Sequence, residues 1–108
     1  MIEPNKRILP TLEAYRKANC CQFKIINKVV AYGKIEEKIN LDNRITESRI
    51  IDTNRNYNNS TFDIIPSLTI REVLDYKKFT RKNLICDIEG SEVELLKNEI
   101  ETIYYQVE

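Results

Sequence analysis

The sequence contains no histidine. Histidine is the commonest general base in enzymes and the commonest metal ligand in proteins. Its absence therefore excludes every catalytic triad that needs an imidazole. If the chain carries out acid–base chemistry, a carboxylate is the expected base.

Long apolar runs and a net charge are also missing. The apolar stretches are only a few residues long, far short of the ~20 that cross a bilayer, and residues 1–10 have no apolar core of the signal-peptide type. Lys plus Arg and Asp plus Glu each number 17, whereas a phosphate backbone attracts a cationic surface. The sequence therefore predicts a cytoplasmic chain that binds neither nucleic acid nor a membrane.

Cysteine is scarce, with three residues. Cys20 and Cys21 are neighbours, and disulfide geometry strains a bridge between adjacent residues. Cys86 lies in an apolar run, which predicts a small buried side chain. We expect reduced thiols here and no disulfide framework of the secreted type.

What remains has the composition of one globular domain. Hydrophobic residues make up 42% and charged residues 31% of 108 residues, a length near the common size for a single core. A chain of this length buries roughly two-thirds of its unfolded surface. We therefore treat residues 1–108 as a single domain.

The first half of the chain has the periodicity of one helix and two strands. Apolar residues recur at helical spacing over residues 5–19. Residues 22–32 and 34–41 are β-like, and the glycine between them predicts a hairpin. Residues 42–60 are polar and rich in asparagine, which predicts a long loop with one short edge strand near Ile50.

The second half alternates strands with helices. Residues 62–68 are extended, and Pro66 confines that strand to an edge or terminal position. Thr69 opens a short helix with a T-x-x-E capping box. Residues 84–87 form a short apolar run typical of a buried parallel strand.

A second capping box, S-E-V-E, starts at Ser91. The helix after it is expected to bury a stripe made of Val93, Leu96, Ile100 and Ile103. Residues 104–107 are expected to open a last strand. This alternation predicts an α/β fold, a mixed sheet flanked by helices.

Three carboxylates, Asp87, Glu89 and Glu92, follow the predicted strand at residues 84–87. Ligands of open α/β sheets bind at the carboxyl ends of strands. These groups could position a hydroxyl or accept its proton, or hold a hard cation through oxygen, although we assign no metal. The alternative is a plain helix start, where acidic residues favour the dipole and Ser91 caps.

The string D-I-E-G-S-E at residues 87–92 resembles the "D-x-E-G-x-E" signature of FkbM-type methyltransferases, which use S-adenosyl-L-methionine. I-E-P-N at residues 2–5 resembles the "E-P-N" that ends the family's second strand. V-A-Y-G at residues 30–33 and S-L-T-I-R-E-V-L at residues 67–74 resemble its "A-V-G" and "T-L-D-E-L" blocks. Arg71 departs from the acidic residue expected there. The resemblance covers nearly the whole chain.

This resemblance implies a partial Rossmann-like class I methyltransferase fold, running from the second strand to about the fifth. It also implies a preceding strand with a glycine-rich turn for the methionine half of the cofactor. The chain has two glycines, Gly33 and Gly90, and neither precedes Glu3. We therefore expect an N-terminally truncated domain. A fragment of a longer gene, a degenerate remnant and a small protein with another use for the half-domain are all open.

The resemblance also implies roles for particular residues. Glu3 matches the carboxylate that accepts hydrogen bonds from the cofactor ribose, with Asn5 beside it; an exposed glutamate without a ligand is the alternative. Asp87, Glu89 and Glu92 match the catalytic acidic positions, and Asp87 would orient or deprotonate the acceptor. The implied reaction is O-methylation of a small-molecule sugar or alcohol hydroxyl in the intact parent.

Two further expectations follow. Asn58, Asn59 and Ser60 fall where a substrate-facing loop is plausible, with an ordinary surface loop as the alternative. A missing first strand leaves unpaired strand edges, so another copy can supply the neighbour strand and the chain is expected to be a homo-oligomer. The rival to the enzyme is a non-catalytic fragment or assembly module that folds by oligomerising, and the 108 residues alone are expected to be inactive.

Overall fold

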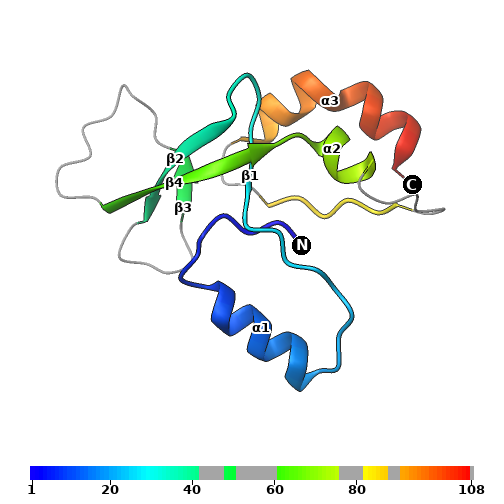
Figure 1. Cartoon of the computed structure of the whole chain (residues 1–108). Helices are drawn as coiled ribbons and strands as arrows, with labels where there is room; N and C mark the ends of the chain where they lie inside the picture. Colours follow the sequence, from blue (N-terminus) through cyan, green and yellow to red (C-terminus); the bar gives the residue numbers. More distant parts are fainter. Residues whose placement is uncertain (42–47, 51–60, 76–81, 88–90, 108) are drawn as a thin grey trace.

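The structure is a computed structural model that describes residues 1–41, 48–50, 61–75, 82–87 and 91–107. In chain order its elements are α1 (Leu9–Ala18), β1 (Val29–Val30), β2 (Glu36–Leu41), β3 (Ser48–Ile50), β4 (Thr61–Leu68), α2 (Ile70–Asp75) and α3 (Glu92–Gln106) (Figure 1). The expected α/β class is confirmed. None of the helices in these ranges has the length and apolar character needed to cross a membrane.

The sheet has the strand order β1-β4-β2-β3 and is mixed, as expected. β4 pairs antiparallel with β2, from Glu36↔Pro66 to Leu41↔Thr61, and parallel with β1. β3 pairs antiparallel with β2 at the edge, where a short strand was predicted. The predicted hairpin around Gly33 is wrong, because β4 lies between β1 and β2. Gly33 still makes a turn, with φ of 77°, a value that favours glycine.

Pro66 decides where the parallel pairing begins. The backbone nitrogen of Ser67 donates to the oxygen of Ile35 at 2.9 Å, so the neighbouring nitrogen of Pro66 faces the opposite edge, toward β1. Proline has no hydrogen to donate there. Pairing with β1 accordingly starts one residue later, at Val29↔Ser67. The prediction that Pro66 confines this strand to an edge or terminal position is therefore wrong, because β4 lies between β1 and β2.

The core consists of two clusters. Ile65 and Ile39 are the most deeply buried side chains, 0% and 1% exposed, on one face of the sheet. Val29, Ala31 and Leu41 complete that cluster, and the second cluster is made of Val30, Leu68, Ile70 and Leu95. The opposite face of β4 exposes Phe62 and Ile64. β4 therefore alternates between core and solvent as a half-buried strand should.

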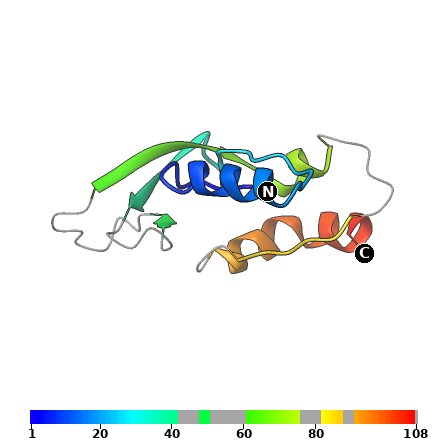
Figure 2. The same ribbon diagram turned by 90° about the horizontal axis from the view of Figure 1, so that it is seen from below.

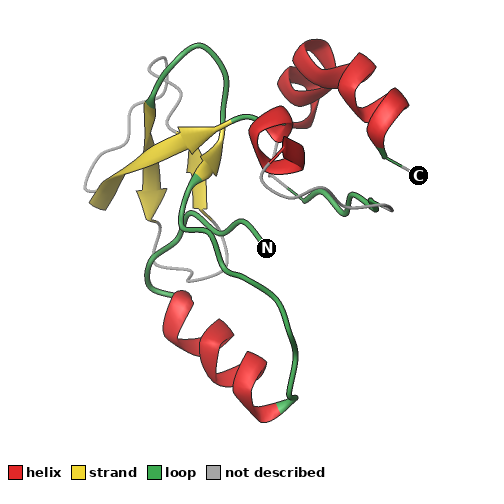
Figure 3. Cartoon of the chain, turned by 45° about the vertical axis from the view of Figure 1, so that its right-hand side comes forward, coloured by secondary structure: helices red, strands yellow, loops and turns green. Residues whose placement is uncertain are grey.

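α1 extends away from the sheet and buries none of its residues (Figure 3). It begins next to Pro10, in its first turn, as predicted. The chain before it is held by a parallel bridge between Ile2 and Ile26 and by an ion pair of 3.2 Å between Lys6 and Asp63. The N-terminal segment is thus anchored to the sheet, whereas the helix itself is not.

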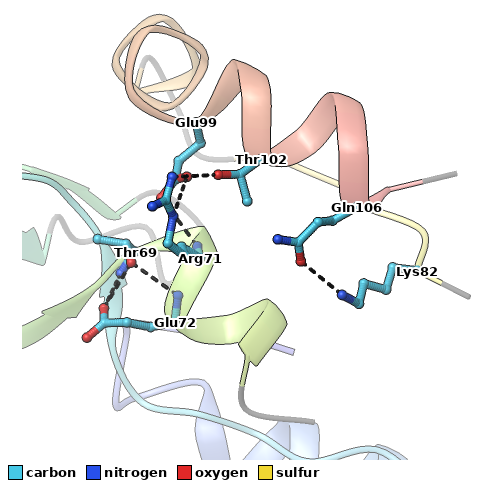
Figure 4. Close-up of polar contacts among 7 residues, drawn as sticks. All are labelled: Thr69, Arg71, Glu72, Lys82, Glu99, Thr102 and Gln106. Atoms are coloured by element: carbon cyan, nitrogen blue, oxygen red, sulfur yellow. Dashed lines mark hydrogen bonds and ion pairs between the residues drawn. The ribbon is translucent and has the colours of Figure 1, made fainter. Parts of the chain in front are cut away.

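α2 and α3 are joined by polar contacts (Figure 4). The Arg71 guanidinium donates to Oγ1 of Thr102 at 3.0 Å, and the Arg71 backbone nitrogen donates to Oε1 of Glu99 at 3.3 Å. Glu99 and Thr102 are 4% and 5% exposed. The basic residue that departs from the family's acidic position therefore ties α2 to α3.

The first capping box is confirmed. The Glu72 backbone nitrogen donates to Oγ1 of Thr69 at 3.2 Å, and the Thr69 nitrogen donates to Oε2 of Glu72 at 2.6 Å. The bond from the Thr69 nitrogen, together with one from the Thr69 hydroxyl to Oε2 at 3.1 Å, lowers the pKa of the Glu72 carboxyl. The second box is wrong: α3 starts after Ser91 as predicted, but the Ser91 side chain makes no capping hydrogen bond.

The strand predicted at residues 84–87 does not form. Residues 82–87 run alongside α3 in both Figure 1 and Figure 2, outside the sheet. Within the described chain, no backbone hydrogen bond joins residues 84–87 to a neighbour, and a strand needs a partner ladder. Cys86 is correspondingly exposed, which corrects the expectation of a buried thiol.

The end of α3 and its buried face also differ from expectation. The helix continues through Gln106, because the Val107 nitrogen donates to the oxygen of Ile103, so the predicted last strand at residues 104–107 is wrong. Its buried side chains are Leu95, Glu99 and Thr102, whereas Val93, Leu96 and Ile100 are exposed. Only Ile103 of the predicted stripe packs against the core.

Replacing Ile65 by Val is expected to lower the free energy of unfolding by about 1 kcal/mol, because a buried methylene is lost and leaves a gap. Ile64→Val is the matched control on the exposed face, with an expected change of at most about 0.5 kcal/mol. Urea denaturation followed by circular dichroism measures both. Equal losses of unfolding free energy from the two substitutions would contradict the assignment of Ile65 to the buried face of β4 and of Ile64 to the exposed face.

Thr69→Ala is expected to cost about 1 kcal/mol of unfolding free energy, because the nitrogen of Glu72 loses its capping oxygen. Ser91→Ala should cost less, since the Ser91 side chain caps nothing. The same denaturation measurement compares the two. A larger loss from Ser91→Ala would show that the second box does form.

Candidate functional site

A cleft of about 370 Å³ lies where the N-terminal segment, the sheet and residues 84–87 meet. Residues 1–4 form one wall and residues 84–87 another. Apolar side chains from the sheet and α2 form much of the remaining lining, among them Val30, Ile39 and Ile70. Volumes of about 300–1,000 Å³ with an apolar lining and a few polar groups are typical of small-molecule sites.

Glu3 lies in this cleft and its position is fixed by the backbone. Its nitrogen donates to the oxygen of Ile26 at 3.0 Å, and the Asn27 side chain donates to the Glu3 oxygen at 2.9 Å. One carboxylate oxygen, Oε1, accepts from the nitrogen of Asn5 at 2.7 Å. No donor in the described chain contacts Oε2, so this oxygen can still accept hydrogen bonds from a ligand.

Asn5 lies just outside the cleft and is 3% exposed. Its Oδ1 accepts from the nitrogen of Arg7 at 3.0 Å, and its own nitrogen donates to Glu3. Both bonds span two residues, the pattern by which asparagine starts a turn. Asn5 thus orients Glu3 and leads the chain into α1. A direct contact of Asn5 with a cofactor stays a prediction.

Asp87 lines the cleft from the opposite wall, and Ser91 lies at the same site. Sequence reasoning brought Glu3 and Asp87 to one site, and the structure places both on one cleft although they are far apart in the chain. It had treated Ser91 only as a cap. Glu92 opens the first turn of α3. Glu89, Asn58, Asn59 and Ser60 lie outside the described residues.

The pKa of Cys86 depends on the charges at this wall of the cleft. Partial burial of its sulfur raises the pKa of the thiol, and the carboxylates of Glu92 and Asp87 raise it further. The thiol is therefore protonated at neutral pH and is a poor nucleophile. The two acidic residues lie close enough to act on one neighbour, and the cleft carries negative charge at this end.

A buried polar pair lies at the α2–α3 contact. The hydroxyl of Tyr32 has no hydrogen-bond partner in the described chain, and neither has Oε2 of Glu99. Burial, followed by the charge of Glu99, raises the pKa of Tyr32 to about 12. Sequence analysis did not predict this pair, because the apolar stripe expected on the helix did not include Glu99.

S-adenosyl-L-methionine, the cofactor that the resemblance implies, would need particular groups in the cleft. The apolar lining suits an adenine ring, and Glu3 offers an acceptor to a ribose diol. The methionine half needs a glycine turn or a cation for its carboxylate, and the residues known to line the cleft include no glycine, lysine or arginine.

No protein-family model, curated protein or solved structure matches this chain. The likeness to FkbM-type methyltransferases rests on the four sequence blocks alone, and stays a prediction.

Glu92→Gln is expected to lower the Cys86 pKa toward its ordinary value, because removing a nearby negative charge favours the thiolate. In a Cys20→Ser/Cys21→Ser background, alkylation of Cys86 near neutral pH should speed up by roughly twofold. Glu94→Gln, the same change two residues further into the helix, is the control. Equal rates for Glu92→Gln and the parent would contradict the assigned proximity.

Proposed function

We propose that this chain is part of an FkbM-type methyltransferase that transfers a methyl group from S-adenosyl-L-methionine to a sugar or alcohol hydroxyl. One observation supports this above all others. Glu3 and Asp87, the two residues that match the family's ribose-binding and reaction-centre positions, line a single cleft of about 370 Å³. The two residues are far apart in the chain, so local sequence alone does not bring them together.

Glu3 binds the nucleoside end. A ribose presents two neighbouring hydroxyl donors, and a carboxylate is the side chain best able to accept both. Asn5 holds Oε1 at 2.7 Å and so fixes the plane of the carboxylate before any ligand arrives. A carboxylate oriented in advance loses less side-chain freedom on binding.

Asp87 acts on the acceptor. S-adenosyl-L-methionine supplies an electrophilic methyl group when it is bound. The acceptor hydroxyl must then be oriented and lose its proton, and a carboxylate is the base that a chain without histidine can offer. Asp87 lines the cleft opposite Glu3, so an acceptor bound in the cleft can reach its carboxylate.

A non-catalytic module is the second candidate. The observation that favours it is that the residues known to line the cleft include no glycine, lysine or arginine for the carboxylate of the methionine half. In that case the cleft would still take a nucleoside or an apolar segment, without methyl transfer.

Titration calorimetry with adenosine and with S-adenosyl-L-methionine is expected to give binding that depends on Glu3. Glu3→Gln should weaken both ligands by about tenfold or more, because it removes charge-assisted hydrogen bonds to the ribose. Glu94→Gln, an exposed acidic residue away from the cleft, is the control and should leave both affinities unchanged.

The ratio of the two affinities separates the candidates. Tighter binding of S-adenosyl-L-methionine than of adenosine supports the methyltransferase, since the methionine half then finds a partner. Equal affinities favour the non-catalytic module. Absence of heat with both ligands, or affinities insensitive to Glu3→Gln, would refute the proposed nucleoside site.

A further inference from the structure

Residues 82–87 form an open edge with apolar side chains. Ile85 is 97% exposed and Leu84 is 36% exposed. Among the described residues, no backbone hydrogen bond joins residues 84–87 to another segment. An exposed apolar segment with unpaired backbone groups is a template for pairing with another strand.

The sequence of this edge, K-N-L-I-C-D, is complementary to itself when reversed. An antiparallel pair of two copies, centred between Leu84 and Ile85, sets each Leu84 opposite an Ile85. The same register sets Lys82 opposite Asp87 at both ends. Opposite residues of antiparallel strands point to the same face, and opposite charges or apolar pairs there are stabilising.

We propose that two copies of this chain associate by antiparallel pairing of residues 82–87 in that register. The association is isologous: one two-fold axis generates both ion pairs and both apolar pairs from the same six residues. Leu84 and Ile85 leave water, and the backbone gains the ladder that it lacks within one copy.

Charge selects this register over its neighbours. A slip of one residue would set Asp87 opposite Asn83 and would leave both Lys82 side chains without their carboxylates. A slip also changes the face to which each side chain points. Both ion pairs form only in the register centred between Leu84 and Ile85.

Pairing brings a cation to the cleft. Asp87 lines the cleft, whose known lining has no lysine or arginine. In the pair, Lys82 of the second copy lies beside Asp87. Within one copy, Lys82 donates a single hydrogen bond of 3.0 Å to Gln106 at the surface, and an ammonium group has two further donors. The second copy thus supplies a lysine, a residue type that the known lining of a single copy's cleft does not contain.

Charge reversal tests the pairing. Sedimentation equilibrium of the full chain is expected to show a dimer that each of Lys82→Asp and Asp87→Lys weakens by about tenfold or more, because two ion pairs become two repulsions. The double variant Lys82→Asp/Asp87→Lys should restore the dimer. Lys97→Asp, an exposed position on α3, is the matched control and should change nothing. Circular dichroism checks that every variant is folded.

A cross-link tests the register. The pairing sets Asn83 opposite Cys86 of the second copy, so Asn83→Cys in a Cys20→Ser/Cys21→Ser background should form a disulfide-linked dimer under mild oxidation. Lys97→Cys in the same background should not. Peptide mapping must join the introduced thiol to Cys86.

Three outcomes would overturn the proposal. One is a monomer at every concentration tested. Another is a dimer indifferent to both single reversals, which would assign association to a different surface such as the exposed side of α3. The third is a failure of the double reversal to restore association. None of these bears on nucleoside binding, so the proposed function and the dimer fail separately.

Discussion

The structure depends on the pairing of β4 with strands on both of its edges. Its antiparallel ladder with β2 buries Ile65 and Ile39 in one cluster. Its last residues pair with β1 and bring Leu68 into the second cluster, with Val30. Because one strand takes part in both clusters, it connects the sheet to α2 and α3, and residues of both clusters line the cleft.

The features that could be predicted from the sequence are those that depend on residues close together in the chain. The capping box at Thr69, the proline at the start of α1 and the short edge strand each depend on neighbouring residues, and each was predicted. The predicted hairpin was wrong because no local sequence feature indicates that β2 pairs with β4 instead of with β1. The strand at residues 84–87 failed for a related reason: an apolar run forms a strand only if a partner edge lies beside it.

Sequence analysis singled out two residues that line the cleft, but not the contacts around them. Motif order brought Glu3 and Asp87 forward, and both line the cleft. Sequence analysis did not predict that Asn5 starts a turn or that Arg71 contacts Glu99 and Thr102. Both interactions depend on distances in the folded chain. Glu99 was least predictable, because a buried carboxylate breaks the apolar pattern by which a helix face is recognised.

The missing hydrogen on Pro66 has a consequence for solubility. The edge of β4 beyond β1 is exposed to any extended chain that approaches it, and such edges seed aggregation. A strand that tried to lengthen the β1 ladder toward Ile64 would meet a position with no donor and a bulky ring. Pro66 therefore acts as a stop that limits growth of the sheet on this side, while the edge at residues 82–87 stays open to a partner.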